Sequence, residues 1–288
     1  MKEKKKVTKS VIAPVIPRIK SLQVKLARGI CQFPVIKGVV FSNKGAQGRA
    51  PLGDFSENQT GDILAYWEDE SKGLICISAP EEGYEIQAPE NLDAMFGGST
   101  MAGCGLSYLD VSHLDVSRTY SFRRCFSFFG WEKDSYIKGL ENWDIGNGIY
   151  FHEMFYRTFQ YNKKINLDLS EWKFSPKRIV NAWGMFRSFG ENTEEINLDV
   201  TGWDVKTVDD FSEAFFGFGS LAKKVNILGL EDWNIQPGTN VSRMFAVFCQ
   251  KCDYHLDLSK WNMKDTQTHC RADFSTGNFF RIKEPRWK

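Results

Sequence analysis

The chain has 288 residues and a formal net charge of +1, and it is long for a single globular core. No segment approaches the roughly 20 apolar residues of a membrane-spanning helix, which excludes a membrane span. The seven cysteines cannot all pair within one chain, and this odd number favours reduced, buried thiols over a disulfide framework.

Residues 1–30 are predicted to form a basic N-terminal arm that docks elsewhere. They contain nine Lys or Arg residues and one Glu, so the rest of the chain carries a net charge of about −7. Such an arm suits nucleic acid, an anionic surface or an acidic neighbour in an assembly, and a solvated tail is the alternative. Pro14 and Pro17 interrupt the apolar run after Lys9, so the arm does not resemble a secretion signal.

Residues 31–90 are predicted to form a β-rich capping element. The runs 63–67 and 74–78 are apolar and are separated by the polar stretch 68–73, a pattern typical of a β-hairpin. Because the first unit of a repeat array exposes an apolar end, we expect this element to cover it.

Residues 91–288 are predicted to contain about six repeats. Tryptophans recur at intervals of 29, 31, 30 and 28 residues, and an aromatic residue follows each of the first four after 12 or 14 residues. We expect these rings to form the core between layers. The tryptophans are Trp143, Trp172, Trp203, Trp233 and Trp261, and the phenylalanines are Phe155, Phe186, Phe215 and Phe245.

Each repeat is predicted to contain one short strand and one short helix. A short alternation of apolar and polar residues favours the strand. The helix is predicted from segments such as 240–248, which begin with a capping residue and place Val241, Met244, Phe245 and Phe248 at helical spacing. The expected fold class is therefore an α/β repeat solenoid, a leucine-rich-repeat-like horseshoe.

A short phrase recurs in the repeats, and each copy is followed by Met-Phe or its equivalent. The copies include Leu109-Asp110-Val111-Ser112, Asn166-Leu167-Asp168-Leu169-Ser170-Glu171-Trp172 and Asn197-Leu198-Asp199-Val200-Thr201-Gly202-Trp203. Over about residues 31–274 the chain resembles the BspA-type leucine-rich repeat. This resemblance implies a curved, non-enzymatic adhesion or partner-binding protein of the kind found on bacterial surfaces and in some phages.

Acidic residues recur on the predicted strand face and are the candidate binding residues. Asp110, Asp168, Asp199 and Asp257 align in one column, whereas Glu141 and Glu231 lie two residues later in their repeats. Adjacent like charges need compensation. Hydrogen bonds to neighbouring hydroxyl and amide groups, a cationic or hydroxyl-rich ligand, or calcium would each supply it.

Metal-binding and catalytic motifs are weak or missing. Cys249 and Cys252 are weak zinc candidates, with His255, His269 and Cys270 following them. His152-Glu153 lacks the second histidine of an HExxH motif, and no phosphate-binding glycine loop is present. We therefore expect no catalytic residue, no cofactor and no enzymatic activity.

The sequence predicts a protein that recognises a protein or glycan partner through the strand face. The alternatives are a component of a larger assembly such as a phage virion, anchored through residues 1–30, and an intracellular inhibitor of another protein. Nucleic acid is expected as a partner only through the arm. The resemblance implies a cell-surface or extracellular location, whereas the missing signal leaves the virion and the cytoplasm open.

Overall fold

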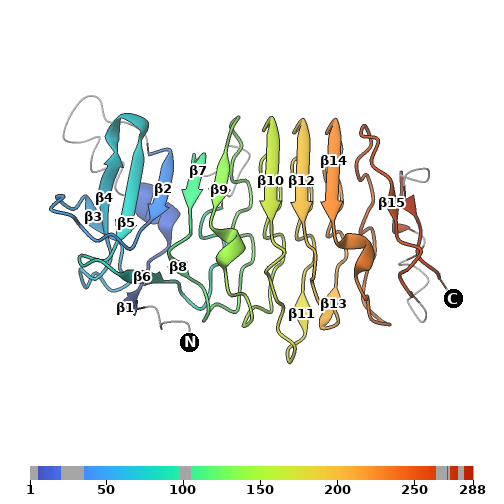
Figure 1. Cartoon of the computed structure of the whole chain (residues 1–288), viewed down its shortest axis with the longest axis horizontal. Coiled ribbons are helices and arrows are strands. Elements are labelled where there is room, and N and C mark those ends of the chain that lie inside the picture. The colour runs from blue at the N-terminus through green and yellow to red at the C-terminus, as the bar shows by residue number, and fades with distance from the viewer. Residues whose placement is uncertain are drawn as a thin grey trace.

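The computed structural model describes residues 6–20, 36–97, 105–263, 271, 273–277 and 282–287. The molecule is elongated, and its strands lie side by side along the long axis from the N-terminal to the C-terminal end (Figure 1). The chain therefore builds up layer by layer along this axis.

The N-terminal region shares one sheet with the first repeats. In spatial order this sheet contains β3 (Gly53–Asp54), β4 (Leu64–Asp69), β5 (Leu74–Ser78), β2 (Gly38–Phe41), β7 (Tyr108–Asp110) and β9 (Tyr136–Lys138). Strands β4 and β5 are antiparallel and are joined by the 3-10 helix η1 (Glu70–Lys72), which confirms the predicted hairpin. Strand β2 pairs in parallel with both β5 and β7, so the sheet continues from this region into the repeats.

Part of the predicted basic arm lies inside the fold. Strand β1 (Lys6–Val11) pairs in parallel with β6 (Tyr84–Gln87), which also pairs with β8 (Leu114–Asp115). A helix follows over residues 15–20, and the side chains of Ile12, Val15 and Ile19 are at most 3% exposed. Residues 6–20 therefore pack into the protein's own core, while residues 1–5 and 21–30 of the arm lie outside the described part.

The central repeats pair residue by residue. Strands β10 (Lys164–Asp168), β12 (Glu195–Asp199) and β14 (Lys224–Leu228) are parallel, and Ile165 lies opposite Ile196, which lies opposite Val225. All three of these side chains are buried, because alternate residues of a strand point to opposite faces.

Shorter elements complete the layers. The 3-10 helices η2 (Leu140–Asn142) and η3 (Leu230–Asp232) follow β9 and β14. A second line of parallel pairing joins β11 (Val180–Asn181) to β13 (Val208–Asp210), at the opposite edge of the molecule from β10, β12 and β14 (Figure 1). Near the C-terminus β15 (Leu256–Asp257) pairs with β16 (Ile282–Lys283).

The segments around each Met-Phe or equivalent pair are turns rather than helices. We call residues 123–130, 152–159, 183–190, 212–219 and 242–249 the turn segments. In the second of them the N–H groups of Phe155 and Arg157 bond to Met185 and Arg187 of the next layer, at 2.8 and 3.0 Å. Glu153 and Arg157 have φ values of 48° and 52°, outside the helical region.

The predicted fold class is therefore wrong. The described residues form parallel and mixed β-sheets with turns, and helical residues make up only 7% of the structure. An α/β solenoid with one short helix per repeat does not describe this chain, because the segments expected to be helical direct alternate N–H groups to the neighbouring layer instead of along their own axis.

Two rows of aromatic rings fill the interior. Phe96, Phe126, Phe155, Phe186, Phe215 and Phe245 stack in consecutive layers, with centroids 5.2 to 5.6 Å apart. Trp172, Trp203, Trp233 and Trp261 form a second row at 5.5 to 6.2 Å. Offset or parallel stacking adds to the stabilisation from burying these rings, so the rows bind each layer to the next.

Candidate recognition face

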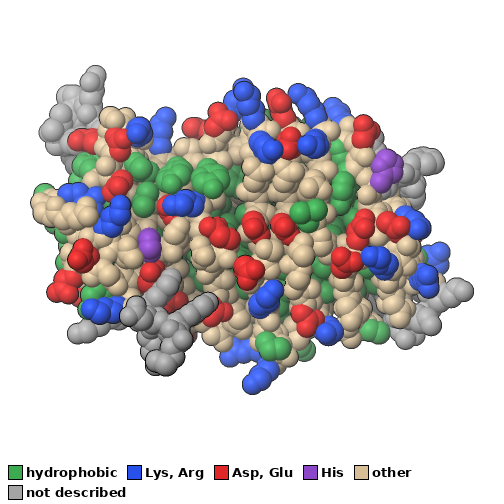
Figure 2. All heavy atoms as spheres, viewed as in Figure 1, with side chains coloured by type: hydrophobic (Ala, Val, Ile, Leu, Met, Phe, Trp, Pro, Cys, Tyr) green, Lys and Arg blue, Asp and Glu red, His purple; other side chains and the backbone are tan. Residues whose placement is uncertain are grey.

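The outward side chains of β7, β9, β10, β12 and β14 form the candidate site, which we call the strand face. Its first row on the central strands consists of Lys164, Glu195 and Lys224, which lie opposite one another. Glu195 accepts from Lys164 at 2.8 Å and lies 3.5 Å from Lys224. The hydrogen bond from Lys164, a second one from Asn197 and the charges of both lysines lower the pKa of Glu195 to about 2. Figure 2 shows basic and acidic side chains alternating over the upper ends of these strands.

The second row consists of amides. Asn166, Asn197 and Asn226 lie opposite one another, two residues along each strand from the charged row. The side-chain nitrogen of Asn197 donates to the side-chain oxygen of Asn166 at 2.9 Å and to Glu195 at 2.9 Å. This row was not predicted from the sequence, although the repeated Asn-Leu-Asp phrase is a signal that could have revealed it.

Two of the six candidate acids, Asp168 and Asp199, lie side by side in the third row. They are paired residues of β10 and β12, at the ends of these strands. Oδ1 of Asp168 accepts from the backbone and side chain of Ser170 at 3.0 and 2.7 Å. Oδ1 of Asp199 accepts from the backbone of Thr201 at 2.9 Å. One oxygen of each carboxylate therefore closes a local turn.

Asp110 and Asp257 lie at the ends of β7 and β15, and each is paired with a lysine. Asp110 is buried and accepts from Lys138 at 2.8 Å. Burial raises the pKa of Asp110, but hydrogen bonds from Lys138 and Ser112 outweigh it, so this pKa lies below its usual value. Hydrogen bonds from Lys283, 2.8 Å away, and from Ser259 lower the pKa of the more exposed Asp257.

Glu141 and Glu231 lie outside the strands, in η2 and η3. Glu141 accepts from the backbone of Gly139 at 3.1 Å, and Glu231 accepts from the backbone of Asp257 at 2.9 Å. In strand register Asp199 faces Leu228, and Asp110 faces Lys138. The predicted acidic column is therefore interrupted at β9 and at β14.

A close backbone approach explains the interruption at β14. Gly229 follows that strand with a φ of 84°, and a Cβ atom there would lie 2.4 Å from the Cα of Thr201. Only glycine can combine this close approach to Thr201 with a positive φ. The chain then turns into η3, which moves the acid off the sheet.

The predicted aromatic core residues lie in the interior. The five tryptophans are 0 to 5% exposed, and Phe155, Phe186, Phe215 and Phe245 are at most 1% exposed. Indole nitrogens also bond to the preceding layer: those of Trp172 and Trp203 donate to the carbonyls of Leu140 and Leu169, both at 2.7 Å. The indole nitrogen of Trp233 is buried without a partner.

The weak zinc candidates Cys249 and Cys252 are joined in a disulfide, and both are fully buried. Reduced thiols were expected here, and disulfide sulfurs do not supply the thiolates that zinc needs. Cys76 and Cys125 are free and buried. Among the described residues no cluster of three metal-ligating side chains occurs, and His269 and Cys270 lie outside them.

A partly exposed aromatic pair adjoins these rows, and no pattern in the sequence had pointed to it. Tyr108 and Tyr136 lie opposite each other on β7 and β9, with ring centroids 6.3 Å apart. Tyr136 is 49% exposed. The strand face therefore combines an amide row, a charged row, carboxylates and a tyrosine platform.

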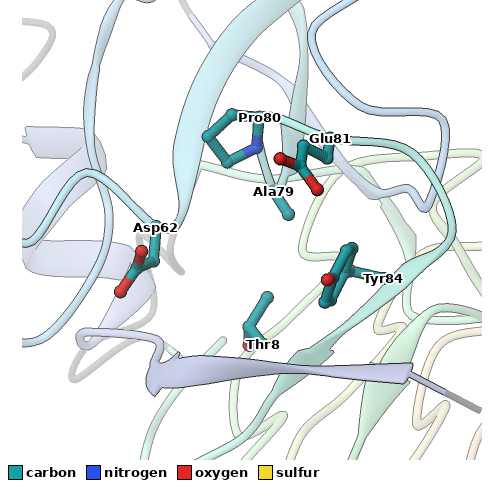
Figure 3. Close-up of a pocket in the computed structure, with 6 residues that line it drawn as sticks. All are labelled: Thr8, Asp62, Ala79, Pro80, Glu81 and Tyr84. Atoms are coloured by element: carbon teal, nitrogen blue, oxygen red, sulfur yellow. The ribbon is translucent and has the colours of Figure 1, made fainter.

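A separate small pocket lies near β1 and β6. Two carboxylates, a phenol and a threonine surround it, as Figure 3 shows. Asp62 already accepts hydrogen bonds from Ser10 and Thr60 of the fold. The pocket measures about 220 Å³ and is lined by Thr8, Asp62, Ala79, Pro80, Glu81 and Tyr84, none of which belongs to the strand face.

Comparisons with known proteins identify one family. Neither the curated proteins nor the solved structures gave a match. Among the described residues no helix is long and apolar enough to cross a membrane. One family model matches residues 90–227 and again 184–287, and it says nothing about the BspA-type repeat that the phrases resemble. These matches span more than half of the chain, which therefore belongs to the family described as Mycoplasma protein of unknown function, DUF285.

Proposed function

We propose that this protein is a non-enzymatic recognition protein whose strand face binds a glycan or protein partner. The observation that supports this most strongly is the set of three outward rows on β10, β12 and β14. Their members lie opposite one another on paired strands, so the backbone fixes their spacing. Side chains held on rigid elements bind with a small loss of conformational entropy.

The amide row and the tyrosine platform favour a glycan. An asparagine amide both donates and accepts hydrogen bonds, as a sugar hydroxyl requires. The exposed ring of Tyr136 offers an apolar face, and its hydroxyl group remains polar. The row of Lys164, Glu195 and Lys224 is the observation that favours a protein partner instead, because charged rows give specificity to protein interfaces.

The carboxylates of the strand face support recognition rather than catalysis. Asp168 and Asp199 each hold a turn, and Asp110 is neutralised by Lys138. A general acid needs a raised pKa, whereas the pKa of Asp110 lies below its usual value, because hydrogen bonds from Lys138 and Ser112 outweigh the effect of burial.

The test applies the labelled protein to a printed panel of oligosaccharides and compares it with the triple variant Asn166→Ala, Asn197→Ala, Asn226→Ala. The parent should retain a subset of glycans, and the variant should bind them about tenfold or more weakly, at roughly 1 kcal/mol per lost hydrogen bond. A variant carrying Glu171→Ala and Lys206→Ala, both exposed and off the strand face, is the control. Equal binding by parent and triple variant would reject the strand face as the glycan site.

The alternative role in an assembly can be tested separately. Since residues 6–20 are part of the core, deletion of residues 1–30 would damage the fold, whereas deletion of residues 1–5 removes three lysines and spares β1. If those lysines anchor the chain to an anionic partner, the short deletion releases it from vesicles or particles that retain the parent. Unchanged retention would contradict anchoring by these residues.

A further inference from the structure

A cluster of aromatic side chains lies outside the strand face, beside the second line of parallel pairing. Tyr150 forms bridges with Ser121 and with Asn181 of β11. Its ring centroid lies 6.5 Å from that of Tyr120 and 5.7 Å from that of His152. The ring of His152 in turn lies 6.4 Å from that of Trp183. We call Tyr120, Tyr150, His152 and Trp183 the aromatic edge.

The aromatic edge is open to solvent, unlike the ring rows of the interior. Tyr150 is 41% exposed, and the other three side chains are partly exposed. The rings come from three consecutive layers, which are about 4.8 Å apart along a parallel sheet. An extended ligand lying along the molecular axis can therefore contact one ring after another.

Acidic residues flank the aromatic edge at both ends. Asp93 lies on one side, where it accepts from the hydroxyl of Ser121 and from the backbone of Arg123 at 2.5 and 3.1 Å. Asp210 lies on the other, in β13, where the side-chain nitrogen of Asn181 donates to it at 3.4 Å. The side chain of the neighbouring Asp209 is exposed, although the surrounding chain removes part of its solvent, and this partial desolvation together with the charge of Asp210 raises its pKa. Among the described residues no ion pair with Lys or Arg neutralises these three carboxylates.

These carboxylates are therefore available to pair with a cationic partner. The charges of Arg123, Asp210 and Asp93 all act on the ring of His152. Burial, followed by the charge of Arg123, lowers the pKa of His152. At neutral pH the imidazole is then an uncharged aromatic ring.

We propose that the aromatic edge binds an extended, Lys- or Arg-bearing segment of a partner protein. Cationic side chains are attracted to the faces of Trp and Tyr rings and pair with carboxylates, and this surface offers both. Tyrosine and tryptophan also dominate the binding energy of protein interfaces. The inference does not depend on the proposed function, because its residues are separate from the rows of the strand face.

The test measures the binding of fluorescently labelled hexa-arginine to the full chain by anisotropy. Tyr150→Ala and Trp183→Ala should each weaken binding about tenfold, and Asp209→Asn about threefold, in line with cation–π and exposed ion-pair strengths. Binding should weaken as salt is added. Hexa-glutamate should not bind.

Two control variants keep the result specific. Tyr161→Ala removes another exposed tyrosine, and Asp204→Asn removes an exposed carboxylate elsewhere. Neither should change hexa-arginine binding, and the triple asparagine variant of the strand face should not change it either. Circular dichroism of each variant establishes that it is folded.

Three outcomes would overturn the proposal. One is binding of hexa-arginine that survives both ring substitutions. Another is tighter binding of neutral cellohexaose than of hexa-arginine, with the same variants affected, which would assign the edge to glycans. The third is a dimer in size-exclusion chromatography that Tyr150→Ala dissociates, which would assign the edge to a second copy of the chain.

Discussion

The strands β10, β12 and β14 and the turn segments that follow them are stacked with the same period but by different backbone conformations. The strands pair in register with ordinary extended dihedrals, and each buries alternate residues. The turn segments bond between layers through every second N–H group, and some of these donors have left-handed dihedrals, such as Glu213, whose N–H bonds to Ser242 of the next layer. The comparison shows that two different backbone conformations can hold buried side chains in a regular stack.

The strongest test of this comparison is a cavity on the turn side. Phe186 is fully buried and stacks on Phe155 and Phe215 at 5.2 and 5.4 Å. Phe186→Ala should lower the free energy of unfolding by about 3–5 kcal/mol, measured by urea denaturation. Leu198→Ala in β12 is the strand-side counterpart and should cost about 2–5 kcal/mol. A loss below about 1 kcal/mol for Phe186→Ala would show that the turn segments are not part of the cooperative core.

A smaller effect compares two tryptophans that follow strands. Trp203 donates to the carbonyl of Leu169 at 2.7 Å, whereas the buried indole nitrogen of Trp233 has no partner. Trp203→Phe should therefore destabilise the protein by about 1 kcal/mol more than Trp233→Phe, because the second substitution also removes an unsatisfied polar group. Equal losses in thermal denaturation would contradict this difference in hydrogen bonding.

The backbone contrast itself can be tested with glycine. Val247 has a φ of 59° in the last turn segment, a conformation that strains a β-branched residue. Val247→Gly should stabilise the protein by about 0.5–1 kcal/mol, since the relief of strain of about 1–2 kcal/mol exceeds the cost of glycine's flexibility. Asn226→Gly in β14 should instead destabilise by about 0.5–1 kcal/mol. Destabilisation by both substitutions would mean that the turn segment carries no such strain.

The smallest effect concerns pH on the strand side. Lys164 and Asn197 lower the pKa of Glu195 from 4.5 to about 2. The folded state therefore gains stability from the ionised Glu195 above pH 4.5, and loses it as the pH falls towards 2. Glu195→Gln should reduce the acid sensitivity of the melting temperature, and added salt should reduce it in the parent. If Glu195→Gln and the parent show the same pH dependence of the melting temperature, the contacts of Glu195 with the charged row do not stabilise the fold.

The sequence revealed the layers and their interior but not the backbone that carries them. Val241, Met244, Phe245 and Phe248 recur at helical spacing, and all four are buried. The turn segment buries the same positions, so periodicity alone does not distinguish it from a helix.

A readable signal for the turn segments did exist. Gly130, Gly190 and Gly219 occupy equivalent positions four residues after their phenylalanines, and all have positive φ. In the last repeat Cys249 takes the same position and conformation, which hides the signal there.

The candidate site was predictable in part. The recurrence of Asp168 and Asp199 was visible in the sequence, and the structure places them side by side. The displacement of Glu231 from the sheet depends on the contact between Gly229 and Thr201 of the previous layer. This contact joins residues that are 28 positions apart in the chain, and neither composition nor motif spacing predicts such a distance.

The uniform stacking of the layers has a consequence for how such a chain can change its length. Each internal layer contacts its neighbours through equivalent backbone groups and equivalent rings. If the coding segment of one layer is duplicated or lost, the two layers that then become neighbours still have matching surfaces. The family model fits this chain at two overlapping positions, as expected where one layer resembles the next. Recombination could thus lengthen the molecule in steps of about 4.8 Å and extend its reach without inventing a new interface.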